Sequence, residues 1–327
     1  MKRSMLPWLI VAALLLLAFP VVAEKFYLQL VTKIMILSIF ALSLDLLVGY
    51  TGMVSLGHAA YFGVASYTYA LASQGSDPAN VWLTLPLALA ASAAAALVVG
   101  ALVVRTSGVY FIMVTLAFAQ MAYYFFHDTR IAGGSDGIYV NARPDAIVPG
   151  LDLGNDLHFY YFVLAALAIV FALLAIILRS PFGRALQGIK ANEHRMRSLG
   201  FATLHYKLAA FVLAGTIAGL AGYLAAAKEG YVNPEMMAWH QSGTVLMMLI
   251  LGGMGTLFGA VLGAFSYVLL QEWLSALTKH WQLLMGGFIV AAVLLLPQGL
   301  VGLDRLRLRG RRRGVSSGPL VRAPAQV

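Results

Sequence analysis

The chain has 327 residues, of which 61% are hydrophobic and only 11% are charged. A soluble globular domain carries about 25% charged residues, so this composition excludes an ordinary soluble fold. The absence of cysteine excludes disulfides, thiolate metal sites and cysteine nucleophiles. Apolar runs long enough to cross a bilayer recur along the whole chain, whereas a strand-built barrel would show short alternating segments. We therefore expect one all-α, polytopic membrane domain with about eight to ten spans.

The expected spans follow one another along the chain, at residues 5–23, 34–50, 58–73, 81–104, 109–126, 159–178 and 208–227. A stretch interrupted by glycines at 242–270 and a last span at 281–296 complete a membrane domain of residues 1–305. Residues 1–23 also resemble a secretory signal, because two basic residues precede an apolar run that ends in small side chains. We favour a first helix that is retained, with cleavage as the alternative. In both cases residue 24 is expected on the external side of the membrane.

Basic residues in short loops predict the orientation of the chain. Lys and Arg predominate in loop 179–207 and in the tail 306–327, whereas aspartates predominate in loop 127–157. The first two segments and the N-terminus are therefore expected in the cytoplasm, and loop 127–157 outside. An even number of crossings must then connect Lys207 to the tail. We expect the stretch 242–270 to enter and leave on one face, with two short crossings as the alternative.

The net charge of +9 is explained by this topology, because the positive excess falls on the expected cytoplasmic side. Nucleic acid is not needed as a partner. The tail 306–327 has the composition of a disordered segment held near anionic membrane lipid. In the external loop, the glycine-rich residues 133–137 predict a turn, with contact to a partner or solute as the alternative.

Glycines are concentrated in residues 47–63, at the junction of two apolar stretches. Unwound backbone forms solute sites in transporters, but glycines also serve as packing notches between helices, which we favour slightly. The candidate pathway residues here are Asp45, Gly52, Ser55, Gly57 and His58. A buried aspartate is expected to face the bundle interior or water, as a hydrogen-bonding group between helices or as part of the pathway. A single histidine such as His58 is more typical of a structural residue.

Residues 249–263 have the same glycine-rich character. They add Gly252, Gly253 and Gly255 to the candidate pathway, and they suggest an internal repeat of the first glycine segment. The pairs Gly215/Gly219 and Gly259/Gly263 are expected to be packing contacts.

Loop 180–207 predicts one amphipathic helix. Ser180 followed by Pro181 is typical of a helix start, and Gly200 of a helix end. Apolar residues recur between them at three- and four-residue spacing, at Phe182, Leu186, Ile189, Met196 and Leu199. Glu193 falls within this stripe, which suits docking into a protein groove and, equally, binding to the inner leaflet.

Residues 183–190 only distantly resemble a phosphate-binding loop, because they lack the Gly-Lys-Ser/Thr ending and follow no strand. If transport uses ATP, another chain must hydrolyse it. No metal-ligand spacing occurs, so we expect no catalytic residue, no metal and no cofactor bound by this chain.

These segments together resemble the LivM-like permeases of bacterial branched-chain amino acid ABC importers. The resemblance covers about residues 35–303 and rests on residues 46–52, 55–63, 108–111, 115–120, 133–137, 180–186, 192–193, 199–200, 206–211, 251–256 and 296–302. It implies a multi-pass subunit of the bacterial inner membrane that is not itself an enzyme. The implied partners are a second, LivH-like permease, two cytoplasmic ABC ATPase subunits that use ATP, and a periplasmic solute-binding protein.

The resemblance also favours docking of the loop to the ATPase, through Arg184, Glu193, Gly200 and Lys207. It adds Thr115 and Gln120 to the candidate pathway. The chain departs from the family where His194, Arg195 and Met196 replace small residues, and where Asp45 replaces a common asparagine. These departures put the details of docking, and any charge-dependent role of position 45, in doubt.

The implied solutes are leucine, isoleucine and valine. Urea and short amides, which are handled by close relatives, are the alternative within the same class. An ion-gradient-driven secondary amino-acid carrier, with Asp45 as its ion site, is the alternative from another class.

Overall fold

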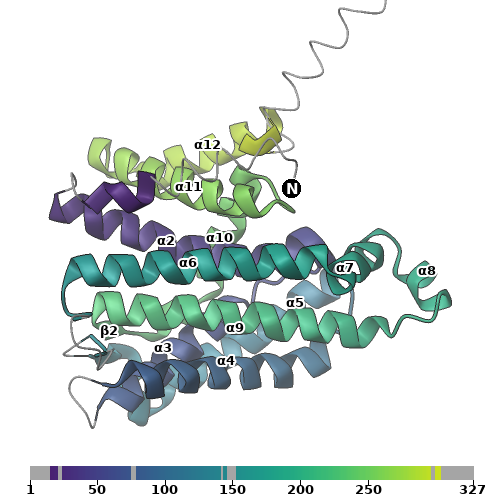
Figure 1. Ribbon diagram of the computed structural model, residues 1–327, viewed down its shortest axis with the longest axis horizontal. Coiled ribbons are helices and arrows are strands. Elements are labelled where there is room, and N and C mark those ends of the chain that lie inside the picture. The colour runs from purple at the N-terminus through teal and green to yellow at the C-terminus, as the bar shows by residue number, and fades with distance from the viewer. Residues whose placement is uncertain are drawn as a thin grey trace, which may run out of the picture.

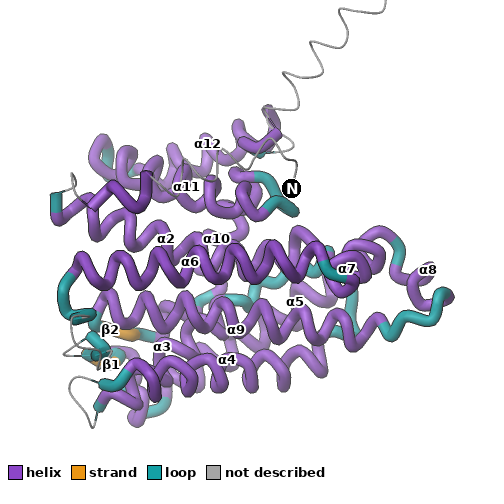
Figure 2. Tube along the Cα trace, viewed as in Figure 1, coloured by secondary structure: helices purple, strands orange, loops and turns teal. Residues whose placement is uncertain are grey.

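The computed structural model describes residues 15–20, 24–74, 79–140, 143–145, 152–295 and 299–302. Within them the chain forms a bundle of helices with one two-stranded sheet (Figures 1 and 2). Most of the expected first span and the whole basic tail 306–327 lie outside the described residues.

Seven helical segments among the described residues are long and apolar enough to cross a membrane. They are α2 (Lys25–Asp45) with its π-helical continuation η2 (Leu46–Thr51), α4 (Val81–Val103), α5 (Val109–Asp128), α6 (Asp156–Arg179), α9 (Thr203–Glu229), α11 (Leu257–Leu277), and α12 (Trp281–Leu295) with η6 (Leu300–Gly302). Two shorter apolar helices are α3 (Ala59–Ser73) and α10 (Trp239–Gly252). The predicted polytopic helical fold is confirmed.

Helix α9 lies in the middle of the bundle and packs on α2, α3 and α4. Its small residues allow this, because interfaces between membrane helices require close backbone approach. A Cβ at Gly215 would collide with Ala96, and one at Gly219 would collide with Ser92. The prediction that Gly215 and Gly219 are packing contacts is confirmed.

Helices α10 and α11 form an antiparallel hairpin. Gly252 lies against Gly259, and Gly263 lies against the carbonyl group of Met248, which confirms the packing role of Gly259 and Gly263. The break predicted in 242–270 is therefore present. With 14 residues, α10 is about 21 Å long, shorter than the ~30 Å hydrocarbon core of a bilayer.

The two ends of the bundle are built differently. One end carries the short sheet and three 3-10 turns: β1 (Ile138–Tyr139), β2 (Tyr231–Val232), η3 (Arg130–Ala132), η4 (Gly134–Asp136) and η5 (Pro234–Met237). Residues 133–137 form the predicted turn there, with glycines of positive φ at Gly133, Gly134 and Gly137. The other end carries α7 (Pro181–Ala191) and α8 (Glu193–Ser198), which extend beyond the bundle in Figure 1.

Candidate functional site

The first glycine segment opens a break between two helices. Helix α2 passes into the π-helical η2, which ends at Gly52 with a φ of 77°. Glycine is favoured there because a left-handed backbone brings a Cβ into steric conflict. Residues 53–57 are not helical, and α3 begins at Ala59. The predicted unwinding is thus present, and π-helical turns are frequent at functional sites.

The second glycine segment lies directly against the first. A Cβ at Gly49 would come within 2.6 Å of the amide nitrogen of Gly255 and 2.7 Å of its Cα. Two backbones at this separation leave no room for a side chain at position 49. We call the meeting of residues 45–52 with residues 253–256 the glycine junction.

Asp45 is fully buried at the glycine junction. Its Oδ1 accepts a hydrogen bond of 2.8 Å from the Gly255 amide, while Oδ2 has no partner among the described residues. Asp45 therefore joins α2 to the break between α10 and α11, as expected for a group that links helices. Its place in a solute pathway stays a prediction.

Lys190, from the loop helix α7, reaches the same junction. Its Nζ donates a hydrogen bond of 2.6 Å to the carbonyl oxygen of Gly49, and its Cγ lies 3.2 Å from the Cβ position of Gly52. The loop therefore contacts the broken helix directly. The apolar spacing of the loop did not indicate this role, because Lys190 falls outside the stripe.

The prediction of a single loop helix is wrong. Asn192 adopts φ −162° and ψ 99°, which ends α7 and starts α8. The Asn192 side chain accepts a hydrogen bond of 2.9 Å from the Arg195 amide, a typical N-cap that stabilises a new helix. The outer ends are as predicted, because Ser180 caps α7 and Gly200 follows α8 with a φ of 85°.

Glu193 faces the start of α9 and not an apolar stripe. Its carboxylate accepts hydrogen bonds from Lys207 at 3.1 Å, Arg197 at 2.7 Å and Thr203 at 3.2 Å. Burial raises the pKa of Glu193, but the hydrogen bond and charge of Lys207, with Arg197 and Thr203, outweigh it and hold the pKa below its ordinary 4.5. Glu193 and Lys207, both expected to dock a partner, thus bind each other and fasten α8 to α9.

The tip of the loop exposes apolar side chains. Leu199 is 66% exposed, Phe201 38% and Leu204 44%. Arg184 is exposed, and no atom lies within 4 Å of a Cβ position on Gly200. Exposed apolar groups of this kind mark contact with a partner or membrane, so the loop keeps a free surface beside the Glu193 cluster.

His58 is fully buried between α2 and α3. Its Nε2 lies 2.9 Å from the Ser43 hydroxyl oxygen, and its ring is stacked on Phe40. Its Nδ1 has no partner among the described residues. These contacts suit the structural role that the sequence favours for His58.

The remaining predicted residues make hydrogen bonds or packing contacts with residues other than Asp45. Ser55 accepts a hydrogen bond of 3.3 Å from the Gly57 amide, and Gly57 packs against the carbonyl group of Thr115 on α5. Gln120 is partly exposed further along α5. Gly252 packs within the α10–α11 hairpin, and Gly253 lies against Gly299.

A cavity of about 340 Å³ lies at the opposite end of the bundle from the loop helices. Charged side chains from two helices line it, namely Lys33 of α2 and both Lys228 and Glu229 at the end of α9. Helices α3, α10, α11 and α12 and the turn η5 complete its wall. This cavity contains none of the candidate pathway residues expected from the sequence.

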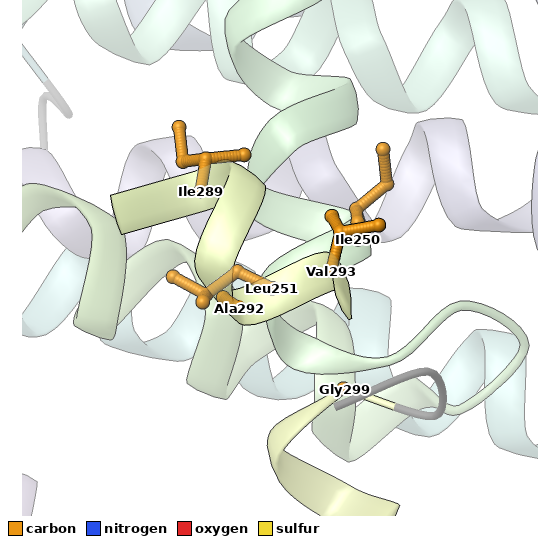
Figure 3. Close-up of a pocket in the computed structure, with 6 residues that line it drawn as sticks. All are labelled: Ile250, Leu251, Ile289, Ala292, Val293 and Gly299. Atoms are coloured by element: carbon orange, nitrogen blue, oxygen red, sulfur yellow. The ribbon is translucent and has the colours of Figure 1, made fainter. Parts of the chain in front are cut away.

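A second, smaller crevice lies between α10 and α12 (Figure 3). Its lining is hydrocarbon and glycine only, from Ile250, Leu251, Ile289, Ala292, Val293 and Gly299. It has no room for a water molecule. A polar solute therefore finds no binding group in this crevice.

Comparison with known proteins decides the family. Residues 26–296 match the family described as branched-chain amino acid transport system / permease component. The chain belongs to this family. The match runs through the glycine junction, the loop helices and the charged cavity, so all three are parts of one transport subunit.

The permease also resembles individual proteins along most of its length. It is 31% identical to the high-affinity branched-chain amino acid transport system permease protein LivM of Salmonella typhimurium, over 89% of this chain and 74% of that protein. LivM of Escherichia coli K12 is 30% identical, over 95% of this chain and 78% of that protein. The autoinducer 2 import system permease protein LsrC of Photorhabdus laumondii is 29% identical over 39% of this chain and 40% of LsrC. No solved structure matches.

Sequence reasoning missed the basic and acidic residues that the fold brings together in this permease. Lys33 lies in α2 and Lys228 in α9, almost 200 positions later, and they line one cavity. Single charges inside apolar spans were the available signal, because charged groups in membranes line cavities or bind one another. Their proximity follows only from the packing of α2 on α9.

Proposed function

We propose that this permease is a transmembrane subunit of an ATP-driven importer for leucine, isoleucine and valine in a bacterial inner membrane. It pairs with a second, LivH-like permease, two cytoplasmic ABC ATPase subunits drive it, and a periplasmic binding protein delivers the solute. The observation that carries the proposal is the family match over residues 26–296, with the full-span similarity to LivM supporting the solute class.

The loop helices couple the ATPases to the pathway. The basic residues of loop 179–207 favour a cytoplasmic position for α7 and α8, where the exposed tip at Leu199, Phe201 and Leu204 would meet the ATPase. Movement of α7 then acts on the glycine junction through Lys190 and the carbonyl oxygen of Gly49, which are 2.6 Å apart. Coupling requires the loop to make different contacts in the two states, and a broken helix bends more easily than a continuous one.

A charge exchange tests whether Glu193 contacts the ATPase or only fastens the loop. Replacing Glu193 with Lys (E193K) removes the ion pair to Lys207 and is expected to abolish uptake of radiolabelled leucine in cells that carry the complete transporter. In the double variant E193K/K207E the pair is restored with opposite signs. If the ATPase recognises the negative charge at 193, uptake stays absent although both variants reach the membrane at the normal level.

Recovery of uptake in the double variant would limit Glu193 to holding the loop, and normal uptake in E193K would contradict the coupling role altogether. The class of transporter is tested separately with the ATPase subunits omitted. Uptake that continues without them and collapses with an uncoupler identifies a secondary carrier. The solute that the cognate binding protein retains distinguishes branched-chain amino acids from urea or short amides.

A further inference from the structure

The cavity of about 340 Å³ places opposite charges beside one opening. Lys33 comes from α2, while Lys228 and Glu229 are the last two residues of α9. Lys228 is close enough to both others to interact with them electrostatically. Among the described residues, neither lysine ammonium makes a hydrogen bond or an ion pair with a carboxylate.

Part of the cavity wall is apolar. It contains Ile36 and Leu37 of α2, Phe62 of α3 and Met248 of α10. Ile36 and Met248 are almost completely buried, so this wall is a fixed part of the core. One cavity therefore offers ammonium groups, a carboxylate and a hydrocarbon surface together.

Charged side chains of membrane-spanning helices are retained where they bind one another or line a water-filled cavity. Small-molecule pockets measure about 300–1,000 Å³ and combine an apolar lining with a few converging polar groups. The cavity meets both descriptions. Uncharged polar side chains such as Gln241 and Gln271 also line the cavity. A ligand that satisfies its charged groups and its apolar wall carries a negative and a positive charge close together, next to a hydrocarbon chain.

We propose that this cavity binds a zwitterionic α-amino acid with an aliphatic side chain, an inference that rests on the proposed function. Lys228 and Lys33 donate to the carboxylate of the ligand, and Glu229 accepts from its ammonium group. The side chain of the ligand lies against Ile36, Leu37 and Phe62.

The position of the cavity suits the arrival of solute. Helix α9 rises about 32 Å between Lys207 and Lys228, so the cavity and the Glu193 cluster lie at opposite ends of the bundle. The glycine junction lies at the loop end, where Lys190 contacts it. The cavity therefore holds the ligand before it reaches the junction.

Because this chain has no cysteine, a cysteine introduced into it is its only thiol, and its labelling can be followed on this chain within the assembled transporter. Thr244 lines the cavity, and T244C introduces a single thiol beside the proposed ligand. L-leucine is expected to slow the reaction of this thiol with a membrane-impermeant methanethiosulfonate several-fold. At the same concentration, 4-methylpentanoate lacks the ammonium group and isoamylamine lacks the carboxylate, so neither is expected to protect.

Charge variants in the T244C background identify the binding groups. K228Q or E229Q is expected to abolish protection by leucine, whereas K279Q changes an exposed lysine outside the cavity and retains it. Loss of protection in all variants including K279Q, or a labelling rate that leucine leaves unchanged in T244C, would overturn the inference. The transporter that contains the unchanged permease chain is assayed for leucine uptake in parallel. If it imports leucine while T244C shows no protection, only the cavity site fails; if it imports no branched-chain amino acid, the proposed function fails.

Discussion

At the scale of single residues, backbone contact explains the glycine junction. Gly49 lies one helical turn after Asp45, and a Cβ on Gly49 would collide with the Asp45 carboxylate and with the backbone of Gly255. The Asp45 carboxylate can accept from the Gly255 amide only because no side chain separates the two segments. The glycines of this region are therefore packing and unwinding positions at once, while solute contact, the other role considered from the sequence, stays a prediction.

Replacing Gly49 with Ala is expected to destabilise the permease. The new methyl group would lie 2.6 Å from the Gly255 nitrogen, and overpacking of this kind costs about 1–3 kcal/mol. We expect a lower melting temperature of the purified protein in detergent and less protein in the membrane. G286A is the matched control, because no atom lies within 4 Å of a Cβ at Gly286 and Ala is favoured over Gly in a helix by about 1 kcal/mol. Equal melting temperatures for G49A and the wild type would contradict the contact.

At the scale of elements, apolar runs predicted the spans and the glycine clusters predicted both breaks. The boundary at Asn192 was missed because apolar residues continue at helical spacing on both sides of it. The Asn192 side chain caps a new helix by accepting from the Arg195 amide. This break is favoured over one continuous helix because the Glu193 carboxylate accepts from three donors when α8 turns toward α9. The contact of Lys190 with Gly49 depends on how two distant elements pack. The residue spacing within one segment carries no information about such packing.

The attachment of α8 is expected to weaken in acid. The pKa of Glu193 is lower in the folded protein than its ordinary 4.5, so its contribution to stability is present above pH 4.5 and is lost as the pH falls through the folded value. Pepsin cleavage at the exposed Leu199 and Phe201 measures this loosening. Wild type and E193Q are compared at each pH, which removes the pH dependence of the protease.

The ratio of the E193Q cleavage rate to the wild-type rate is expected to exceed one above pH 4.5 and to approach one in stronger acid. Protonation of Glu193 removes the carboxylate that accepts from Lys207 and Arg197, which is the change that E193Q imitates at every pH. A ratio that is constant with pH would mean that the carboxylate does not hold α8 in place.

At the scale of the whole molecule, burial is distributed unevenly among the spans. In the most apolar part of each, 89% of residues are buried for α2 with η2, but only 17% for α5 and 13% for the span containing α12. The exposed faces of the outer helices are hydrocarbon surface that lipid or another membrane protein must cover. The central helices α2 and α9 instead extend from the charged cavity to the loop helices, so one buried core links the two ends of the bundle.

The two ends of the bundle are expected on opposite sides of the membrane, and single cysteines can locate them. Ser135 lies in the turn beside β1, and Ser198 lies at the end of α8; both are exposed. An impermeant maleimide is expected to label S135C in right-side-out membrane vesicles and S198C only in inverted ones. The cysteine-free parent reports background labelling. The opposite pattern would reverse the orientation and remove the loop helices from the ATPase side, whereas labelling of both thiols in one vesicle type would contradict the odd number of crossings that separates residue 135 from residue 198.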